Sequence, residues 1–226
     1  MAKRLVYELK KIKKDYNNTT VLNVKHLQCH PGTIYGIIGP IGSGKTTLLK
    51  ILGGRLKPTT GELIFDGEEF KSNWRGKIIP FEDIWYGSLE ELDDKKTVSQ
   101  LFEDNSLLGE NNKDSYFHSK NQNKLLSEQI KNLSQGEKSW LIKCLLKNKD
   151  PRVVILDDYG IYLDRKRELE LQKTILKMNK VLGTTLILGS NDDRNIRKFA
   201  SVLIYFDRGH IAKIRPGTSH KKSRRK

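Results

Sequence analysis

One short segment, GPIGSGKTT at residues 39–47, constrains the fold of this chain more than any other. It fits the pattern GxxxxGK[ST], whose glycines let successive backbone N–H groups turn toward a phosphate without a clash from a Cβ atom. The residues before it, GTIYGIIG, predict a buried strand, and those after it, TTLLKILGG, predict an amphipathic helix. This context seldom arises by chance, so the segment predicts a phosphate-binding loop at the start of a helix.

The side chains of this loop have distinct expected roles. Lys45 supplies a positive charge to the β- and γ-phosphates of a nucleotide, and the hydroxyl of Thr46 coordinates Mg²⁺. ATP and Mg²⁺ are therefore the expected cofactors. The candidate ATP-binding residues of the loop are Gly39, Pro40, Ile41, Gly42, Ser43, Gly44, Lys45, Thr46 and Thr47.

Two further segments complement the loop. RVVILDD places Asp157 at the end of a buried strand, where a carboxylate can hold Mg²⁺, and Asp158 follows as a group that can orient or deprotonate a water molecule. A turn residue at the end of the strand is the alternative for Asp157. LSQGEKS at 133–139 predicts a helix start that offers N–H groups and a hydroxyl to an anion. A helix cap with a capping box is the other interpretation, and both can hold at once.

The rest of the chain predicts an α/β arrangement. Residues 4–27 have the alternation of strands, and GELIFDGEEF at 61–70 predicts another strand with a turn. Short apolar runs without alternation favour central parallel strands that are covered on both faces; they lie at 152–157, 184–189 and 201–206. A helix is expected at about 165–181. The polar segment from about 82 to 132 predicts a small, mostly helical insert.

Together these segments resemble the ATP-binding cassette (ABC) family over residues 16–214. The loop, the LSQGE signature and the strand ending in Asp157 follow the family order, and YLD at 162–164 matches its D-loop with Asp164. Tyr16 stands where the family places an aromatic residue that stacks on adenine. The resemblance implies an α/β P-loop NTPase core with a mostly parallel central sheet, an N-terminal antiparallel β subdomain and a small helical subdomain.

The expected domain limits follow from this resemblance and from composition. The nucleotide-binding core with its β subdomain comprises residues 1–81 and 134–215, the helical subdomain comprises 82–133, and a basic, disordered tail comprises 216–226. The resemblance implies two kinds of partner. A second ABC subunit, identical or related, would have its ATP contacted by the signature residues Ser134, Gln135, Gly136 and Glu137. Transmembrane permease subunits would dock near the start of the insert, where Phe81, Trp85 and Tyr86 cluster, although packing within the insert is the alternative for these aromatics.

Three positions depart from the family pattern around the γ-phosphate. The family usually has Gln after the strand expected near 76–80, where this chain offers Phe81 or Glu82. Asp158 stands in place of the usual Glu, and Asn191 in place of the usual His. Asp is one methylene shorter than Glu, and Asn cannot carry charge or relay a proton. The candidate catalytic residues are thus Asp158, Asn191 and Glu82, with ATP binding retained and hydrolysis expected to be slow.

Charge and hydropathy narrow the function classes. Residues 1–14 carry a charge of +5 and residues 213–226 carry +7 of the net +15, so the excess lies at the two ends and nucleic acid is not the favoured partner. No apolar run approaches the ~20 residues of a membrane span. We expect a cytoplasmic protein, peripheral on the cytoplasmic face of the inner or plasma membrane.

The favoured function is the ATP-binding subunit of a membrane transporter. One alternative is a soluble ABC protein outside transport, acting in iron–sulfur assembly or in association with ribosomes or nucleic acid. Another is a regulatory half of an asymmetric ABC pair that binds ATP without hydrolysing it.

Overall fold

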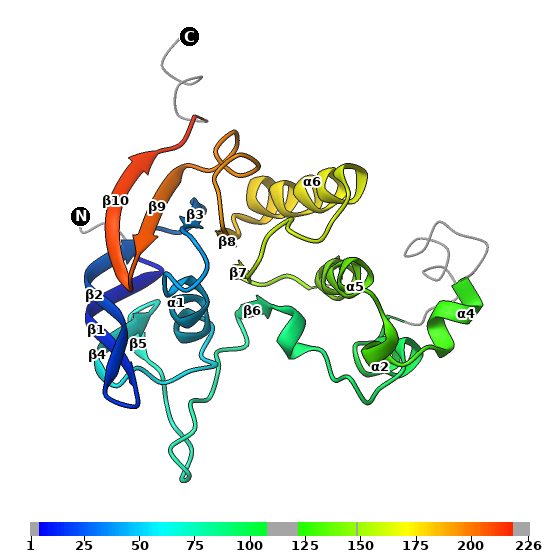
Figure 1. Ribbon diagram of the computed structural model, residues 1–226, viewed down its shortest axis with the longest axis horizontal. Helices are drawn as coiled ribbons and strands as arrows, with labels where there is room; N and C mark the ends of the chain where they lie inside the picture. Colours follow the sequence, from blue (N-terminus) through cyan, green and yellow to red (C-terminus); the bar gives the residue numbers. More distant parts are fainter. Residues whose placement is uncertain (1–4, 108–121, 148, 219–226) are drawn as a thin grey trace. The chain divides into compact units, whose positions relative to one another are not determined.

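The structure is a computed structural model that describes residues 5–107, 122–147 and 149–218 of the chain (Figure 1). No helix in these ranges combines the length and apolar character that crossing a membrane requires.

By contacts within the chain, the molecule divides into two compact units. The first comprises Met1–Tyr86, Pro151–Ile161 and Ile175–Lys226, and the second comprises Gly87–Asp150 and Tyr162–Thr174. The phosphate loop belongs to the first unit, and the LSQGE segment belongs to the second.

A six-stranded sheet in the order β10-β9-β3-β8-β7-β6 forms the centre of the first unit. Strand β3 is parallel to β8 and β9, and β7 is parallel to β8, whereas β10 is antiparallel to β9. All residues of β3, β7 and β8 are buried, which explains why their sequences are almost continuously apolar. The strands are β3 (Ile34–Ile38), β6 (Ile84–Gly87), β7 (Val153–Leu156), β8 (Thr185–Ser190), β9 (Val202–Asp207) and β10 (His210–Pro216).

A second, four-stranded sheet in the order β2-β1-β4-β5 is antiparallel throughout. Its strands are β1 (Tyr7–Tyr16), β2 (Thr19–Cys29), β4 (Thr60–Phe65) and β5 (Glu68–Glu69). Asn17 and Asn18 join β1 to β2 with φ values of 46° and 63°, a left-handed pair that suits the twist of a hairpin.

Helix α1 (Lys45–Leu52) joins the two sheets into one core. Its leucines are buried in the same cluster as residues of β1 and of the parallel sheet, including Leu9, Ile155 and Ile187. The hydroxyl of Tyr7 also donates a hydrogen bond of 2.9 Å to the carbonyl of Leu52. Contacts on both sides therefore fix the helix that follows the phosphate loop.

The second unit is mainly helical. It contains η1 (Leu89–Glu91), α2 (Val98–Asp104), α4 (Gln122–Ser127), η2 (Ile130–Asn132), α5 (Gln135–Lys147) and the first part of α6 (Arg165–Leu182). Thr97 and Gln100 form a capping box at the start of α2. Lys143 on α5 pairs with Glu170 on α6 at 3.2 Å.

The predicted α/β fold, with its parallel sheet, antiparallel sheet and helical part, is confirmed. The structure differs at β6, because residues 84–87 form an edge strand where the sequence predicted only helix and loop. Its sequence, IWYG, is too short and too aromatic to show alternation. Ile84 and Tyr86 are buried in the core of the first unit, and Phe81 lies 4.9 Å from Phe65 between ring centroids. Packing thus accounts for Phe81 and Tyr86.

The contact-based units also differ from the predicted domain limits. The helical unit begins at Gly87 rather than residue 82, because β6 pairs within the central sheet. It also includes α5 and residues 162–174, because the first half of α6 packs against α5. At the C-terminus, Pro216 still belongs to β10, and residues 219–226 of the predicted tail lie outside the described residues.

Candidate functional site

The phosphate loop connects the carboxyl end of β3 to the first residue of α1. The N–H of Gly39 donates to the carbonyl of Ser190 on β8 at 3.2 Å, and the N–H of Ser43 donates to the carbonyl of Pro40 at 3.2 Å. Between them, Pro40, Ile41 and Gly42 are exposed, with Ile41 at 89%. The loop is thus anchored at its base and open to solvent at its crest.

Two glycines in the loop have no room for a side chain. A Cβ atom on Gly39 would lie 2.4 Å from the carbonyl oxygen of Phe206. Gly44 has a φ of 94°, and its Cβ would lie 2.8 Å from the carbonyl oxygen of Val21. The neighbouring strands β9 and β2 therefore press directly against the loop, and only glycine fits.

The turn between β9 and β10 supports the loop from outside. The N–H of Gly209 donates to the carbonyl of Ser43 at 2.9 Å, and the carbonyl of Gly209 accepts from the N–H of Asn23 at 2.8 Å. Gly209 has a φ of 79°, and a Cβ there would lie 2.5 Å from the carbonyl oxygen of Val21. One glycine turn thus ties the loop to the antiparallel sheet.

Lys45 is folded beneath the loop and is only 6% exposed. Its ammonium group donates to the carbonyls of Gly39 at 2.7 Å and Pro40 at 2.9 Å. Burial lowers the pKa of Lys45, and the carboxylates of Asp157 and Asp158 oppose that shift. The ammonium group of Lys45 therefore lies under the backbone of the loop, close to the carboxylates of Asp157 and Asp158.

Asp157 directly follows β7 and lies beside the first turn of α1. Its carboxylate accepts a hydrogen bond from the hydroxyl of Thr46, and its Oδ1 accepts one from the N–H of Asp158 at 3.0 Å. Burial raises the pKa of Asp157, and the charge of Asp158 adds to that increase, whereas Thr46 and Lys45 lower it. A Cβ atom on Gly189 would lie 3.0 Å from Oδ1, so the backbone of β8 closes the other side.

Asp158 leaves the sheet in a left-handed conformation, with a φ of 52°. This geometry is uncommon for a residue other than glycine, although Asp tolerates it better than most. It lets the next N–H, that of Tyr159, donate to the carbonyl of Gly189 at 2.8 Å, and the carbonyl of Asp158 accepts from the N–H of Ile161 at 3.2 Å. Asp158 is exposed, so its carboxylate meets solvent beside the loop.

Asn191 lies at the same edge of the sheet as these groups. It follows Ser190, the last residue of β8, whose carbonyl accepts the N–H of Gly39. Its side chain is exposed. Because Ser190 is hydrogen-bonded to Gly39, the backbone of Asn191 lies near the base of the phosphate loop.

Glu82 lies at the opposite edge, which corrects its predicted place among the catalytic candidates. The carbonyl of Asp83 accepts the N–H of Val153, at the start of β7, at 3.0 Å. The strands β6 and β7 therefore begin at the same edge, whereas the loop, Asp157 and Asn191 lie where strands end. Glu82 is exposed in a turn before β6, about four residues or roughly 13 Å of strand from the other edge.

The error arose because the strand expected near 76–80 is not a strand of the central sheet. Residues 71–79 form a separate hairpin, with Ser72 bridged to Ile78, and the sheet strand is β6. The residue that follows β6 is Ser88, which sequence reasoning missed. Ser88 is 9% exposed, and its hydroxyl accepts the N–H of Glu90 at 3.4 Å.

Tyr16 ends β1 at the tip of the β1–β2 hairpin. It pairs with Thr19, is 47% exposed, and has the ammonium group of Lys14 5.1 Å from its ring centroid. Val21, two residues beyond Thr19, is the residue that abuts Gly44. The exposed ring is thus carried on a hairpin that touches the phosphate loop.

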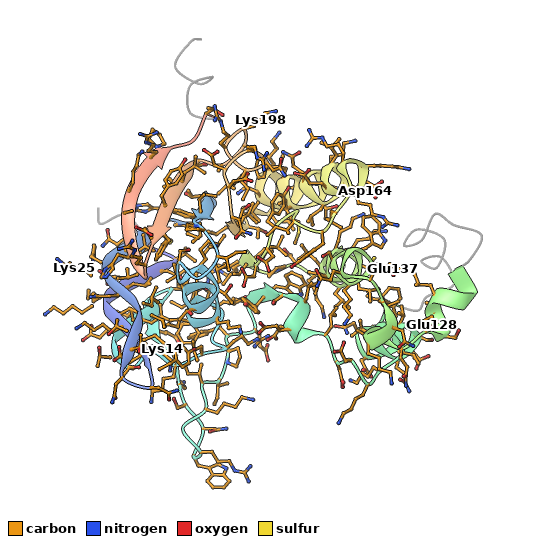
Figure 2. The ribbon with its side chains drawn as sticks, in the orientation of Figure 1. Lys14, Lys25, Glu128, Glu137, Asp164 and Lys198 are labelled. Carbon is orange, nitrogen blue, oxygen red and sulfur yellow. The ribbon has the colours of Figure 1, made fainter. Side chains whose placement is uncertain are left out.

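The signature residues lie in the second unit at the start of α5, where Figure 2 labels Glu137. The N–H and hydroxyl of Ser134 both donate to the carboxylate of Glu137, at 2.9 and 2.7 Å, and the N–H of Glu137 donates back to the Ser134 hydroxyl at 3.3 Å. This is the capping box that the sequence allowed. Ser134 and Gln135 are exposed, and a Cβ on Gly136 would lie 3.0 Å from the carbonyl oxygen of Tyr162.

Asp164 caps the next helix of the second unit, α6. Its Oδ1 accepts the N–H of Arg167 at 2.8 Å, and its carbonyl accepts the N–H of Glu168 at 2.9 Å. The two residues before it in the predicted D-loop are Tyr162, which is 38% exposed, and Leu163. Asp164 therefore has a clear structural role whatever else it contacts.

Comparison with known proteins identifies the family. A family model described as ABC transporter matches residues 22–159, which span the loop, the signature segment and the strand ending in Asp157. The chain belongs to the ABC transporter family. Among curated relatives, the spermidine/putrescine import ATP-binding protein PotA of Legionella pneumophila (strain Paris) is 27% identical over 213 residues, or 92% of this chain and 58% of PotA. The chain thus spans about three fifths of the length of the PotA relatives.

A second curated relative matches this chain over most of the length of both proteins. The lantibiotic transport ATP-binding protein SrtF of Streptococcus pyogenes is 28% identical over 208 residues, or 90% of this chain and 88% of SrtF. Among solved structures, a dimeric ATP-binding cassette in a post-hydrolysis state with ADP and Pi has a TM-score of 0.72 at 20% identity. That match covers 93% of this chain and 98% of the other, and it shows a common fold.

The residues of this ABC chain fit a nucleotide with a magnesium ion. The described ranges contain no cluster of three His, Cys, Asp or Glu side chains that could hold a metal by itself. Thr46 and Asp157 instead offer one hydroxyl and one carboxylate, already within hydrogen-bond reach of each other. Mg²⁺ prefers such hard oxygen donors and is commonly bound through one or two carboxylates together with substrate phosphates.

Proposed function

We propose that the chain is the ATP-binding subunit of a membrane transporter, and that it binds ATP with Mg²⁺ and closes onto a second ABC subunit. The observation that carries the proposal is the loop with Lys45 folded under Gly39 and Pro40, and with Thr46 facing Asp157. Both curated relatives described above are named as ATP-binding proteins of transport or import systems, which supports the same role here.

Nucleotide binding follows from the start of α1. The first N–H groups of a helix have no partner within the helix, and they carry the positive end of its dipole. Lys45, the first residue of α1, adds its ammonium charge beneath the same turn. The loop therefore presents backbone donors and one cation to a triphosphate, while Tyr16 provides an exposed ring for the adenine.

Thr46 and Asp157 would hold the magnesium ion. When bound, Mg²⁺ neutralises charge that develops on the phosphates. The carboxylate must be ionised for this role, and burial makes its ionisation harder. The nearby charge of Lys45 works in the opposite direction and helps to keep Asp157 ionised.

Hydrolysis would depend on Asp158 and Asn191. Asp158 is exposed beside Asp157 and can accept a proton from a water molecule, but its side chain is one methylene shorter than the family's Glu. A displacement of about 1 Å can slow a reaction by ~10²-fold. Asn191 can donate a hydrogen bond but cannot relay a proton. We therefore expect slow turnover with intact ATP binding.

The second ABC subunit would use the exposed residues of the helical unit. Ser134 and Gln135 at the start of α5 offer a hydroxyl and helix N–H groups, which suits a γ-phosphate held by the partner. Asp164 at the start of α6 would lie at the same contact. The second subunit would be an identical or a related chain, and permease subunits would hold the pair at the cytoplasmic face of the membrane.

Steady-state ATPase measurement tests this function. The purified chain should bind ATP but turn it over slowly, alone and with its membrane partners. A second candidate, a regulatory half that binds without hydrolysis, is favoured by Asp158 and Asn191, and it predicts no turnover in either condition. Rapid hydrolysis by the isolated chain that Asp158→Asn abolishes would contradict the expected slow turnover and exclude the regulatory half, whereas failure of the folded chain to bind ATP would contradict the transporter role as well. Recovery of the chain with ribosomes or nucleic acid, rather than with membranes, would favour a role outside transport.

A further inference from the structure

A hairpin at residues 71–79 projects from the first unit between β5 and β6 (Figure 1). Ser72 bridges to Ile78, the N–H of Asn73 donates to the carbonyl of Lys77 at 2.8 Å, and the N–H of Ile79 donates to the carbonyl of Lys71 at 2.9 Å. These bonds make the segment an ordered arm rather than an irregular loop.

The turn at its tip is fixed by two residues. The side-chain oxygen of Asn73 accepts the N–H groups of Arg75 at 3.0 Å and Lys77 at 2.9 Å, and the carbonyl of Asn73 accepts the N–H of Gly76 at 2.9 Å. Gly76 has the φ of 74° that such a three-residue hairpin loop requires. Trp74 and Arg75 therefore lie at the tip of the hairpin.

The base of the hairpin is fixed to the core. Phe70 and Phe81, on either side of it, lie 4.8 Å apart between ring centroids, and Phe81 packs on Phe65 at 4.9 Å. Ile78 is only 8% exposed. The arm is thus anchored at one end and displays its other end to solvent.

The chemistry of the tip is unusual for a solvated surface. Trp74 is 86% exposed, with the guanidinium of Arg75 4.4 Å from its ring centroid. Lys71 and Lys77 add two more cations, Ile79 is 51% exposed, and the segment from 71 to 80 contains no acidic residue. An exposed indole among cations combines an apolar body with charges that favour an anionic surface.

We propose that this hairpin, residues 71–79, inserts Trp74 into the headgroup region of an anionic lipid bilayer, with Lys71, Arg75 and Lys77 on the lipid phosphates. Tryptophan concentrates at membrane–water interfaces, and each cation near an anionic surface strengthens binding about fivefold. The inference does not depend on nucleotide binding.

The size of the tip favours lipid over other partners. A stable protein interface buries about 800 Å² on each partner, far more than the few residues of one turn can supply. Single-stranded nucleic acid is usually held by several stacking side chains along a groove, whereas this arm offers one indole on a convex turn. A bilayer surface needs only one inserted ring and adjacent charges, whatever the orientation of the arm.

Vesicle binding by the full chain tests the proposal. The probes are vesicles of phosphatidylcholine, alone or mixed with phosphatidylglycerol. Wild type should bind the anionic vesicles, Trp74→Ala should bind several-fold less, and the double variant Arg75→Gln/Lys77→Gln should bind about 25-fold less, at fivefold per cation. The double variant Lys25→Gln/Lys198→Gln removes the same charge at exposed sites away from the hairpin (Figure 2) and should lose far less.

Fluorescence quenching locates the contact. Iodide should quench exposed Trp74 in solution, and anionic vesicles should protect it, whereas Trp74→Ala should lack this component. Equal vesicle binding by wild type and both tip variants would overturn the proposal and assign the binding to the basic chain ends. Protection by single-stranded RNA but not by vesicles would also overturn it, in favour of a nucleic-acid contact.

Discussion

The hydroxyl of Thr46 donates a hydrogen bond to the carboxylate of Asp157, joining the first turn of α1 to the residue that follows β7. The carboxylate is largely buried, and burial is the main cause of its raised pKa. The site therefore maintains a charge that its surroundings disfavour, and a bound cation would relieve that cost. Binding and stability should consequently respond in opposite directions when this charge is removed.

Asp157→Asn should raise the melting temperature of the nucleotide-free chain at neutral pH while abolishing the dependence of ATP binding on Mg²⁺. Asn has the same shape and can still accept the hydrogen bond of Thr46, but it carries no buried charge. Calorimetry and ATP titrations with and without Mg²⁺ measure the two effects. Asp158→Asn, at an exposed position, is the matched control and should change stability little.

The pH dependence of stability should follow from the same residue. A folded-state pKa raised above the unfolded value means that the contribution of Asp157 to stability is present at low pH and is lost as pH rises through the folded pKa. The difference in melting temperature between wild type and Asp157→Asn should therefore grow as pH rises from the ordinary Asp pKa of 3.8 through the raised folded-state pKa. A difference that shrinks over that range would contradict the assignment.

Asp158→Glu should accelerate ATP hydrolysis by about tenfold or more, because the longer side chain restores the reach of the carboxylate. The left-handed backbone at this position tolerates Asp better than Glu, so a small loss of stability should accompany the gain. Single-turnover kinetics with saturating ATP measure the step directly. If Asp158→Glu and Asp158→Asn were equally slow, a catalytic role for this carboxylate would be untenable.

Glu82→Gln should leave both ATP affinity and turnover within about twofold of wild type, since Glu82 lies at the amino edge of the sheet. Asn191→His, at the carboxyl edge, is the informative partner and should raise turnover. ATP-binding and ATPase assays of the two variants show which edge of the sheet carries the catalytic groups. If Glu82→Gln lost activity and Asn191→His did not change it, the position of Glu82 away from the catalytic groups would be wrong.

Gly209→Ala should destabilise the chain by about 1–3 kcal/mol and weaken ATP binding, because the added Cβ would meet the carbonyl oxygen of Val21 and displace the turn that supports Ser43. Gly67→Ala is a matched control, since Gly67 has a φ of 90° but has open space around it. It should cost only about 1 kcal/mol of backbone strain and leave ATP binding unchanged. Chemical denaturation and ATP titration provide the comparison.

Much of the first unit could be predicted from the sequence because its signals are local. The apolar runs before and after the phosphate loop, and the strand ending in Asp157, each determine an element within a few residues. The Gly-rich loop itself requires a strand before it and a helix after it. Its glycines at 39 and 44 are explained further by the structure, through contacts with Phe206 and Val21 that no local pattern reveals.

The position of β6 could not be predicted in the same way. Its four residues form an edge strand whose identity depends on pairing with β7, and the preceding hairpin at 71–79 has the apolar residues that sequence reasoning took for the strand. That shift placed Glu82 among the catalytic candidates and hid Ser88. The left-handed backbone of Asp158 could not be predicted from the sequence either. It accompanies the hydrogen bond from the N–H of Tyr159 to the carbonyl of Gly189 on the neighbouring strand.

The central claim, that the chain binds ATP with Mg²⁺ through the loop around Lys45, is tested most directly by equilibrium ATP binding to wild type and Lys45→Ala. Loss of a charge-assisted contact should weaken ATP binding by about 10- to 100-fold. Circular dichroism should show that Lys45→Ala keeps the fold of wild type. Wild type should bind one ATP per chain, more tightly with Mg²⁺ than without. Equal affinity of wild type and Lys45→Ala, or no ATP binding by a folded wild type, would contradict the claim.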